Sequence, residues 1–157
     1  MCSWTDLFAT LNTDGMQKHL FYVDGSGRLL TVNASDVNAT WGIPVVVWGN
    51  TAASGSPALA ACWSLSNING IRVYLGLQAG SVLEIGYDFA GNNSWVSGTR
   101  FSNGDADSGL ACVMSGNSTD NYVNLYMRDR NSGNLLHYYE LNSTRSGASS
   151  HGWVEGM

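Results

Sequence analysis

A repeat of 52 residues is the feature that most limits what this chain can fold into. Three segments, HLFYVDGSGRLLTV, IRVYLGLQAGSVLEI and VNLYMRDRNSGNLLHYY, align on Tyr22, Tyr74 and Tyr126, and consecutive tyrosines are 52 residues apart. Self-similarity at a fixed period of roughly 20–50 residues is typical of solenoids and propellers, in which each copy is one supersecondary unit. We therefore expect three copies of one structural unit.

Each copy contains four signals for short strands. In order they are a cysteine-containing segment, the tyrosine segment, a segment after a glycine-containing turn, and a segment that follows a tryptophan. The tryptophans are Trp41, Trp95 and Trp153. Since four short antiparallel strands make one propeller blade, the sequence predicts an all-β fold, a β-propeller with three four-stranded blades per chain. The repeats fall approximately at residues 1–50, 51–103 and 104–157 of a single domain, residues 1–157.

The turn after each tyrosine segment supports pairing of the second and third strands. These turns, at residues 24–27, 76–80 and 129–133, all contain Gly, and two of them also contain Asp. Gly and Asp tolerate the positive φ that tight hairpins require. The central hairpin of each blade is therefore predicted from local sequence alone.

Three blades are too few to close a ring. An open fan of three blades would leave the faces and edges of its terminal blades exposed to solvent. We therefore expect a homodimer, in which two chains complete a six-bladed ring.

Composition excludes two classes of partner. The net charge is −5, and none of the seven basic residues is adjacent to another, so no basic patch is available for nucleic acid. No run approaches the roughly 20 apolar residues of a membrane helix, which argues against membrane insertion. The opening residues, MCSWTDLFATLN, do not resemble a signal peptide, and we expect a cytoplasmic or non-classically secreted protein.

The three cysteines occupy the same place in the repeat, in the strand that precedes each tyrosine segment. Cys2, Cys62 and Cys112 lie in apolar surroundings and lack metal-ligand spacing. The sequence therefore predicts buried free thiols at all three positions.

Catalysis has little support in the sequence. The three histidines have no metal-ligand spacing, and no Ser or Cys lies in a nucleophile motif. Glycoside hydrolysis would need a carboxylic acid with a raised pKa. The candidate carboxylates show no surroundings that would raise one; they are Asp88, Asp105, Asp107, Glu140 and Glu155. We predict a protein without enzymatic activity, cofactor or metal.

Arg72 and Glu84 form the most informative pair of charged residues. In the second repeat Arg72 alternates with aliphatic residues, so its side chain lies on the other face of the strand. With the turn centred near Gln78, Glu84 is expected opposite or diagonal to Arg72 on the neighbouring strand. One interpretation is a structural salt bridge, worth about 0–1 kcal/mol when exposed. The other is a pair that binds sugar hydroxyls beside an aromatic face.

Three motifs of the second repeat occur in a recognisable order: GSPALAACW at residues 55–63, IRVYLGLQAGSVLE at residues 71–84, and WVSG at residues 95–98. Together they resemble the fucose-binding lectins of the Aleuria aurantia type. The resemblance implies a six-bladed propeller, formed by one chain or by shorter chains that oligomerise, with fucose bound between blades.

The resemblance also implies roles for individual residues. Arg72 and Glu84 would bind the sugar together with Trp153 of the next blade, and Trp95 would serve the preceding site. Tyr87 takes the place of the aromatic residue that follows the family's Glu by three positions. The sugar-binding residues implied are Arg72, Glu84, Tyr87, Trp95 and Trp153.

The other two repeats depart from this pattern. The positions equivalent to Arg72 and Glu84 hold Leu20 and Thr31 in the first repeat, and Asn124 and His137 in the third. We therefore expect one family-like site per chain, two per closed dimer, and no ligand or a different glycan elsewhere.

Two functional hypotheses follow. The first is a carbohydrate-binding lectin for L-fucose or fucosylated glycans, which gains avidity by presenting several weak sites on one ring. The alternative is a propeller that acts as a scaffold for protein-protein interaction and whose sugar sites have degenerated.

Overall fold

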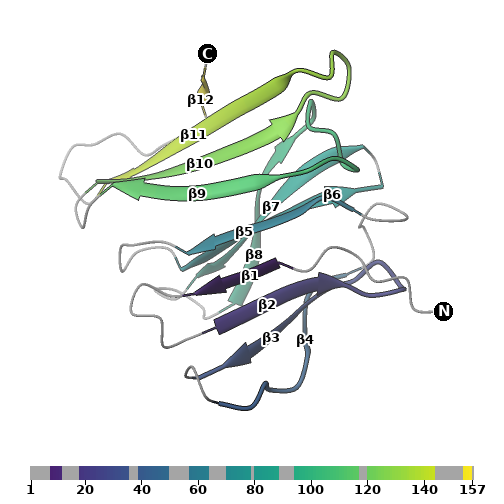
Figure 1. Cartoon of the computed structure of the whole chain (residues 1–157), viewed down its shortest axis with the longest axis vertical. Coiled ribbons are helices and arrows are strands. Elements are labelled where there is room, and N and C mark those ends of the chain that lie inside the picture. Colours follow the sequence, from purple (N-terminus) through teal and green to yellow (C-terminus); the bar gives the residue numbers. More distant parts are fainter. Residues whose placement is uncertain are drawn as a thin grey trace.

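The computed structural model contains three antiparallel sheets of four strands each, stacked one after another (Figure 1). It describes residues 8–11, 18–35, 39–49, 57–63, 70–78, 80–88, 94–116, 120–143 and 154–156. Nowhere in these ranges is there a helix long and apolar enough to span a membrane. Each sheet follows chain order, so each is one blade, as the repeat predicts.

The strands of each blade are as follows. Blade 1 contains β1 (Phe8–Leu11), β2 (Lys18–Val23), β3 (Leu29–Ala34) and β4 (Val45–Trp48). Blade 2 contains β5 (Leu59–Trp63), β6 (Ile71–Leu77), β7 (Ser81–Asp88) and β8 (Ser94–Phe101). Blade 3 contains β9 (Ala111–Gly116), β10 (Asp120–Arg128), β11 (Leu135–Ser143) and β12 (Val154–Gly156).

The central hairpins are confirmed. A glycine with positive φ lies in the turn of each one: Gly27 at 76°, Gly80 at 71° and Gly133 at 75°. Such backbone angles cost little only without a Cβ atom, which explains why each turn contains glycine. In blades 1 and 3 an aspartate carboxylate, from Asp24 or Asp129, also accepts backbone N–H bonds from within the turn.

The outer strands differ in part from the expectation. The strand beside β2 is β1, at residues 8–11, rather than the segment around Cys2, which lies outside the described residues. The last strand of blade 1 begins at Val45, four residues after Trp41. In blade 2, β8 includes Trp95 as predicted, whereas Trp153 lies outside the described residues.

The pairing register corrects the alignment of the first repeat by one residue. Tyr74 lies opposite Glu84 in blade 2, and the equivalent pair in blade 1 is Phe21 opposite Thr31. Phe21 packs against blade 2, and Tyr74 packs against blade 3. Each of the two residues therefore lies on the face that its own blade turns toward the next blade. Phe21, and not Tyr22, is therefore the structural equivalent of Tyr74.

Two apolar interfaces hold the three blades together. Between blades 1 and 2, Phe21 and Leu29 pack against Ile71, Val73 and Ile85, and this contact is the blade 1/2 interface. The blade 2/3 interface contains Tyr74 and Val82 of blade 2 against three residues of β10. Those residues are Val123, Leu125 and Met127. Blade 2 is therefore covered on both faces, which explains why nearly every residue of β6 and β7 is buried.

A disulfide bond joins Cys62 to Cys112 across the blade 2/3 interface, with 5.7 Å between the Cα atoms. The prediction of free thiols is therefore wrong for both. Cys62 lies opposite Arg72 and Cys112 opposite Leu125, so each cysteine is on the face that its own blade turns toward the other. The two do not share one repeat position, because the register of β9 is offset by one residue from that of β5. Cys2 lies outside the described residues.

Candidate functional site

A pair of polar side chains recurs on the same face of every blade. One residue of the pair lies on the second strand of the blade, and the other lies diagonally across from it on the third strand; we call these two residues the anchor pair. The anchor pairs are His19 and Thr31 in blade 1, Arg72 and Glu84 in blade 2, and Asn124 and His137 in blade 3. The predicted equivalent of Arg72 in blade 3, Asn124, is thus correct. The predicted equivalents of Glu84, Thr31 in blade 1 and His137 in blade 3, are also correct. Leu20 is wrong, because it faces the other side of β2 from His19.

Arg72 and Glu84 form the predicted ion pair, with 3.2 Å between Nε and Oε1. The two are diagonal, because Arg72 lies opposite Gly86 and Glu84 opposite Tyr74. Their side chains are only 17% and 6% exposed. This is a largely desolvated pair, so the estimate for an exposed salt bridge does not apply to it.

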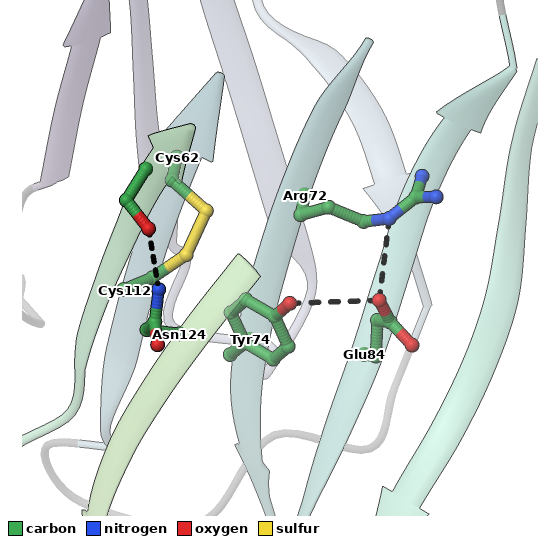
Figure 2. The surroundings of a disulfide bond; sticks show 7 residues. Cys62, Arg72, Tyr74, Glu84, Cys112 and Asn124 are labelled. Carbon is green, nitrogen blue, oxygen red and sulfur yellow. Dashed lines mark hydrogen bonds and ion pairs between the residues drawn. A yellow bond between two sulfur atoms is a disulfide. The ribbon is translucent and has the colours of Figure 1, made fainter. Parts of the chain in front are cut away.

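Two further hydrogen bonds fix the Glu84 carboxylate. Figure 2 shows the Tyr74 hydroxyl, which donates to Oε1 at 3.5 Å. The backbone N–H of Thr99 donates to Oε2 at 3.1 Å. Burial and the adjacent Glu84 raise the pKa of Tyr74, which keeps the phenol protonated and able to donate. A Cβ atom at Gly86 or Gly98 would collide with Arg72 or Glu84, so both glycines make room for the pair.

Glu140 of blade 3 faces this cluster from the other side of the blade 2/3 interface. It lies opposite Val123, a core residue of that interface. Burial raises the pKa of Glu140 to about 7, and the negative charge of Glu84 adds to the rise while Arg72 opposes it. The expectation that no candidate carboxylate has a raised pKa is therefore wrong for Glu140. Its cause is contact between blades, which the sequence of one repeat does not reveal.

Trp95 and Tyr87 lie on the opposite face of blade 2 from Arg72 and Glu84. Their rings meet edge to face, with 5.0 Å between the ring centroids. Trp95 makes a second edge-to-face contact with Phe21, with 5.8 Å between the ring centroids. Trp95 thus lies toward the preceding blade, where the resemblance placed it. Tyr87 does not accompany Glu84, because three residues along a strand reverse the direction of the side chain. The assignment of Tyr87 to the Arg72 and Glu84 site is wrong.

A pocket of about 350 Å³ lies between blades 1 and 2 beside these aromatic rings. Blade 1 contributes the anchor pair His19 and Thr31, together with Asn33 and Val45. Blade 2 contributes Ile71, Tyr87 and Trp95. Sequence analysis missed His19 and Asn33. The one available signal was the alternation of His19 with Phe21, which places both on the same face of β2.

The anchor pair of blade 3 lies on the face that points away from blade 2, which neither of the other two blades covers in the described part of the chain. His137 Nε2 is 3.0 Å from Asn124 Oδ1, and the His137 ring stacks on Tyr126 with 4.6 Å between centroids. Asn124 also donates to Ser115 Oγ at 3.1 Å. Large apolar side chains are exposed on the same face; they are Val113, Tyr122 and Leu135.

A resident metal is not indicated by the described part of the chain. Within it, no three or more His, Cys, Asp or Glu side chains are grouped so that they could hold an ion. The chemistry available at the anchor pairs is instead hydrogen bonding beside apolar and aromatic surfaces, which suits recognition of polyhydroxylated molecules.

Three stacked four-stranded sheets with this strand order define the class of fold: consecutive blades of a β-propeller. No family model matches the sequence, and no curated protein matches it either. Solved structures do. The chain is similar to SapL1 lectin in complex with α-methyl fucoside, at 19% identity and a TM-score of 0.71, over 97% of this chain and 46% of that one.

Two further lectins are similar in structure. The six-bladed β-propeller lectin of Aleuria aurantia matches at 21% identity and a TM-score of 0.67, over 99% of this chain and 48% of that one. A fucose lectin from Kordia zhangzhouensis matches at 18% identity and a TM-score of 0.55, over 96% of this chain and 97% of that one. This chain therefore spans about half the length of the first two, and it has the fold of half of a six-bladed propeller.

Proposed function

We propose that this protein is a carbohydrate-binding lectin without catalytic activity, and that L-fucose or fucosylated glycans are its ligands. The main support is the Arg72 and Glu84 pair, which is largely buried, held by Tyr74 and Thr99, and located on the face of blade 2 that packs against blade 3. The structural neighbours add support, because two of them are described with a methyl fucoside bound.

The pair has the chemistry that sugar recognition requires. A guanidinium offers several N–H donors in fixed directions, and a carboxylate offers acceptors, so together they can bond to adjacent hydroxyl groups. An aromatic ring would cover the apolar C–H side of the sugar. We propose Trp153 for that role, because it directly precedes β12 in the sequence, and β12 pairs with β11 at Tyr139, next to Glu140.

We also propose that two chains associate into a six-bladed ring. The uncovered face of blade 3 supports this, since it exposes Val113, Tyr122 and Leu135 where blades 1 and 2 are covered by their neighbours. The coverage of about half of the six-bladed lectins supports it too. A ring would display several sugar sites at once, and multivalent binding raises avidity without new contacts.

The disulfide bears on where the protein functions. Disulfide bonds persist in oxidising surroundings and are rare in the cytosol. Of the two expectations, cytoplasmic or non-classically secreted, we therefore propose the second. An exported location also suits a protein that captures glycans on surfaces.

The test is calorimetric titration with methyl α-L-fucoside, together with a glycan array, on wild type, Arg72→Gln and Arg100→Ala. We expect wild type and the exposed control Arg100→Ala to bind equally, and Arg72→Gln to bind at least about tenfold more weakly, because one charge-assisted hydrogen bond is worth about 1.5–3 kcal/mol. Thermal melts would confirm that each variant is folded. Absence of binding to any glycan would reject the lectin and favour the protein-interaction scaffold.

A further inference from the structure

Glu140 of blade 3 and Tyr87 of blade 2 occupy equivalent positions with opposite chemistry. Each lies three residues after the second residue of the anchor pair of its own blade, which is Glu84 in blade 2 and His137 in blade 3. Three residues along a strand reverse the direction of a side chain, so both point toward the preceding blade. An aromatic ring at the boundary between blades 1 and 2 is therefore replaced by a carboxyl group at the boundary between blades 2 and 3.

Contacts of the neighbouring residues confirm the direction of the Glu140 side chain. Glu140 lies opposite Val123, which is completely buried in the blade 2/3 interface, and residues directly opposite in a ladder share one face. Tyr138 lies two residues earlier on β11, and its ring contacts Phe101 of blade 2 with 5.1 Å between centroids. Glu140 therefore faces the anchor pair of blade 2.

The position of Tyr87 shows what a residue at this place can reach. Tyr87 and the anchor pair of blade 1 line the same pocket, although they belong to different blades. By equivalence, Glu140 lies beside any molecule that contacts the anchor pair of blade 2. It is half-buried, so it is also accessible from solvent.

The charges at the boundary between blades 2 and 3 do not balance. Arg72 and Glu84 form an ion pair, so their charges offset each other (Figure 2). Glu140 forms no hydrogen bond or ion pair with the rest of the described chain. Burial raises the pKa of Glu140 to about 7, and the negative charge of Glu84 adds to the rise while Arg72 opposes it. When Glu140 is ionised, one negative charge at this boundary thus lacks a cation.

An ammonium group on the ligand is the cation that suits this place. Hydrogen bonds from an ammonium to a carboxylate are charge-assisted and roughly twice as strong as neutral ones. A metal ion suits it less, because within the described ranges no three His, Cys, Asp or Glu side chains are grouped to hold one. Hydroxyl groups next to the ammonium could still bond to Arg72 and Glu84, and a sugar with an amino group carries both.

We propose that Glu140 determines the specificity of the Arg72 and Glu84 site, which prefers a monosaccharide unit with a free, protonated amino group. That ammonium bonds to Glu140 while the sugar hydroxyl groups bond to Arg72 and Glu84. The inference rests on the proposed lectin function and names the ligand class of the same site. N-acetylation removes the positive charge, so the site distinguishes amino sugars from their N-acetyl derivatives. A neutral sugar such as L-fucose binds without help from Glu140.

The experiment is calorimetric titration of the full chain at pH 7 with L-fucosamine, D-galactosamine, their N-acetyl derivatives and methyl α-L-fucoside. Four proteins are compared: wild type, Glu140→Gln, Arg72→Gln and the exposed control Glu155→Gln. We expect wild type to bind at least one amino sugar about tenfold more tightly than its N-acetyl derivative, the effect of one charge-assisted hydrogen bond. Glu140→Gln should remove this preference and leave binding of methyl α-L-fucoside unchanged. Glu155→Gln should keep the preference, which excludes a general attraction of cations to an acidic protein.

The outcomes separate this inference from the proposed function. If methyl α-L-fucoside binds and neither amino sugar binds more tightly than its N-acetyl derivative, the inference fails while the lectin stands. If no sugar binds to wild type, both fail. A preference that survives Glu140→Gln, or amino-sugar binding that survives Arg72→Gln, would overturn the assignment to this site.

A purely structural role of Glu140 predicts a different pattern. Glu140→Gln would then weaken every sugar by the same factor, and that result would also overturn the inference. Thermal melts check that each variant is folded. Glu140→Ala provides a second variant should Glu140→Gln not fold, and it should lose the same preference.

Discussion

The two interfaces between blades use the same strand positions for opposite chemistry. In the blade 2/3 interface the anchor pair is charged, a second carboxylate, that of Glu140, faces it, and a disulfide bond crosses nearby. In the blade 1/2 interface the anchor pair is neutral, its polar atoms lack partners in the described structure, and a pocket lies beside it. The stacking of blades therefore does not depend on the anchor pair. It depends on the aliphatic side chains that pack in each of the two interfaces.

This difference explains how three copies of one unit can diverge without loss of the fold. Phe21 and Tyr74 occupy equivalent positions, and both are completely buried. Only Tyr74 has a hydroxyl group, and that hydroxyl serves Glu84. The aromatic ring at this position packs in the interface in both blades, whereas the hydroxyl group is present only in blade 2, where it bonds to Glu84 of the anchor pair.

Removal of one charge should produce the largest contrast between the interfaces. Glu84→Ala leaves Arg72 largely buried without its carboxylate, and breaking a buried ion pair costs about 3–5 kcal/mol. The equivalent change in blade 1, Thr31→Ala, removes a hydroxyl that has no hydrogen-bond partner among the described residues and should cost less than about 2 kcal/mol. Urea denaturation of both variants measures the two values. Equal losses would show that the interfaces are not energetically different.

The disulfide should have the next largest effect. The double variant Cys62→Ala with Cys112→Ala opens a loop with a sequence separation of 50 residues, and we expect a loss of about 2–4 kcal/mol of stability. Hydrogen exchange should increase at β9 and β10 and remain unchanged at β2 and β3. Faster exchange spread evenly over all three blades would contradict the assignment of the bond to one interface. Non-reducing peptide mapping provides the check that Cys62 and Cys112 are joined.

The smallest contrast is a difference in pH dependence. The pKa of Glu140 is about 7 in the fold against 4.5 as its ordinary value, so the native state binds the proton more tightly. Stability from this group is therefore fully present below pH 4.5 and is lost as the pH rises through 7. Because Glu140 is only partly buried, the loss should be near 1 kcal/mol. Thermal melts of Glu140→Gln at pH 5 and pH 8.5 should show a weaker dependence than wild type.

His19 should act in the opposite direction. Burial lowers its pKa from 6.5, so the unfolded chain binds the proton more readily than the fold does. Stability should therefore decrease as the pH falls below 6.5, and His19→Gln should remove that decrease. If the Glu140 and His19 variants change the pH dependence of stability in the same direction, the contrast between the interfaces is wrong.

The parts of this structure that are local in sequence were the predictable ones. Arg72 and Glu84 belong to one hairpin, whose turn residues set the register well enough to place Glu84 opposite or diagonal to Arg72, and the structure shows the diagonal arrangement. The central hairpins were predictable for the same reason. Each depends only on a glycine turn and on alternation along two adjacent strands.

Contacts between blades could not be predicted in the same way. Alignment on Tyr22 placed Leu20 at the anchor position, and a shift of one residue in a strand moves every side chain to the other face. The same kind of offset, between β5 and β9, turns Cys62 and Cys112 toward each other. The raised pKa of Glu140 likewise arises mainly from burial and, to a smaller extent, from the charge of Glu84, which is on another blade.

The most direct test of the central claim is a crystal structure of the protein soaked with methyl α-L-fucoside. We predict a six-bladed ring of two chains, with the sugar bound between blades 2 and 3 and in contact with Arg72 and Glu84. A ring that carries no sugar at any boundary between blades, or a sugar bound only outside those boundaries, would contradict the account.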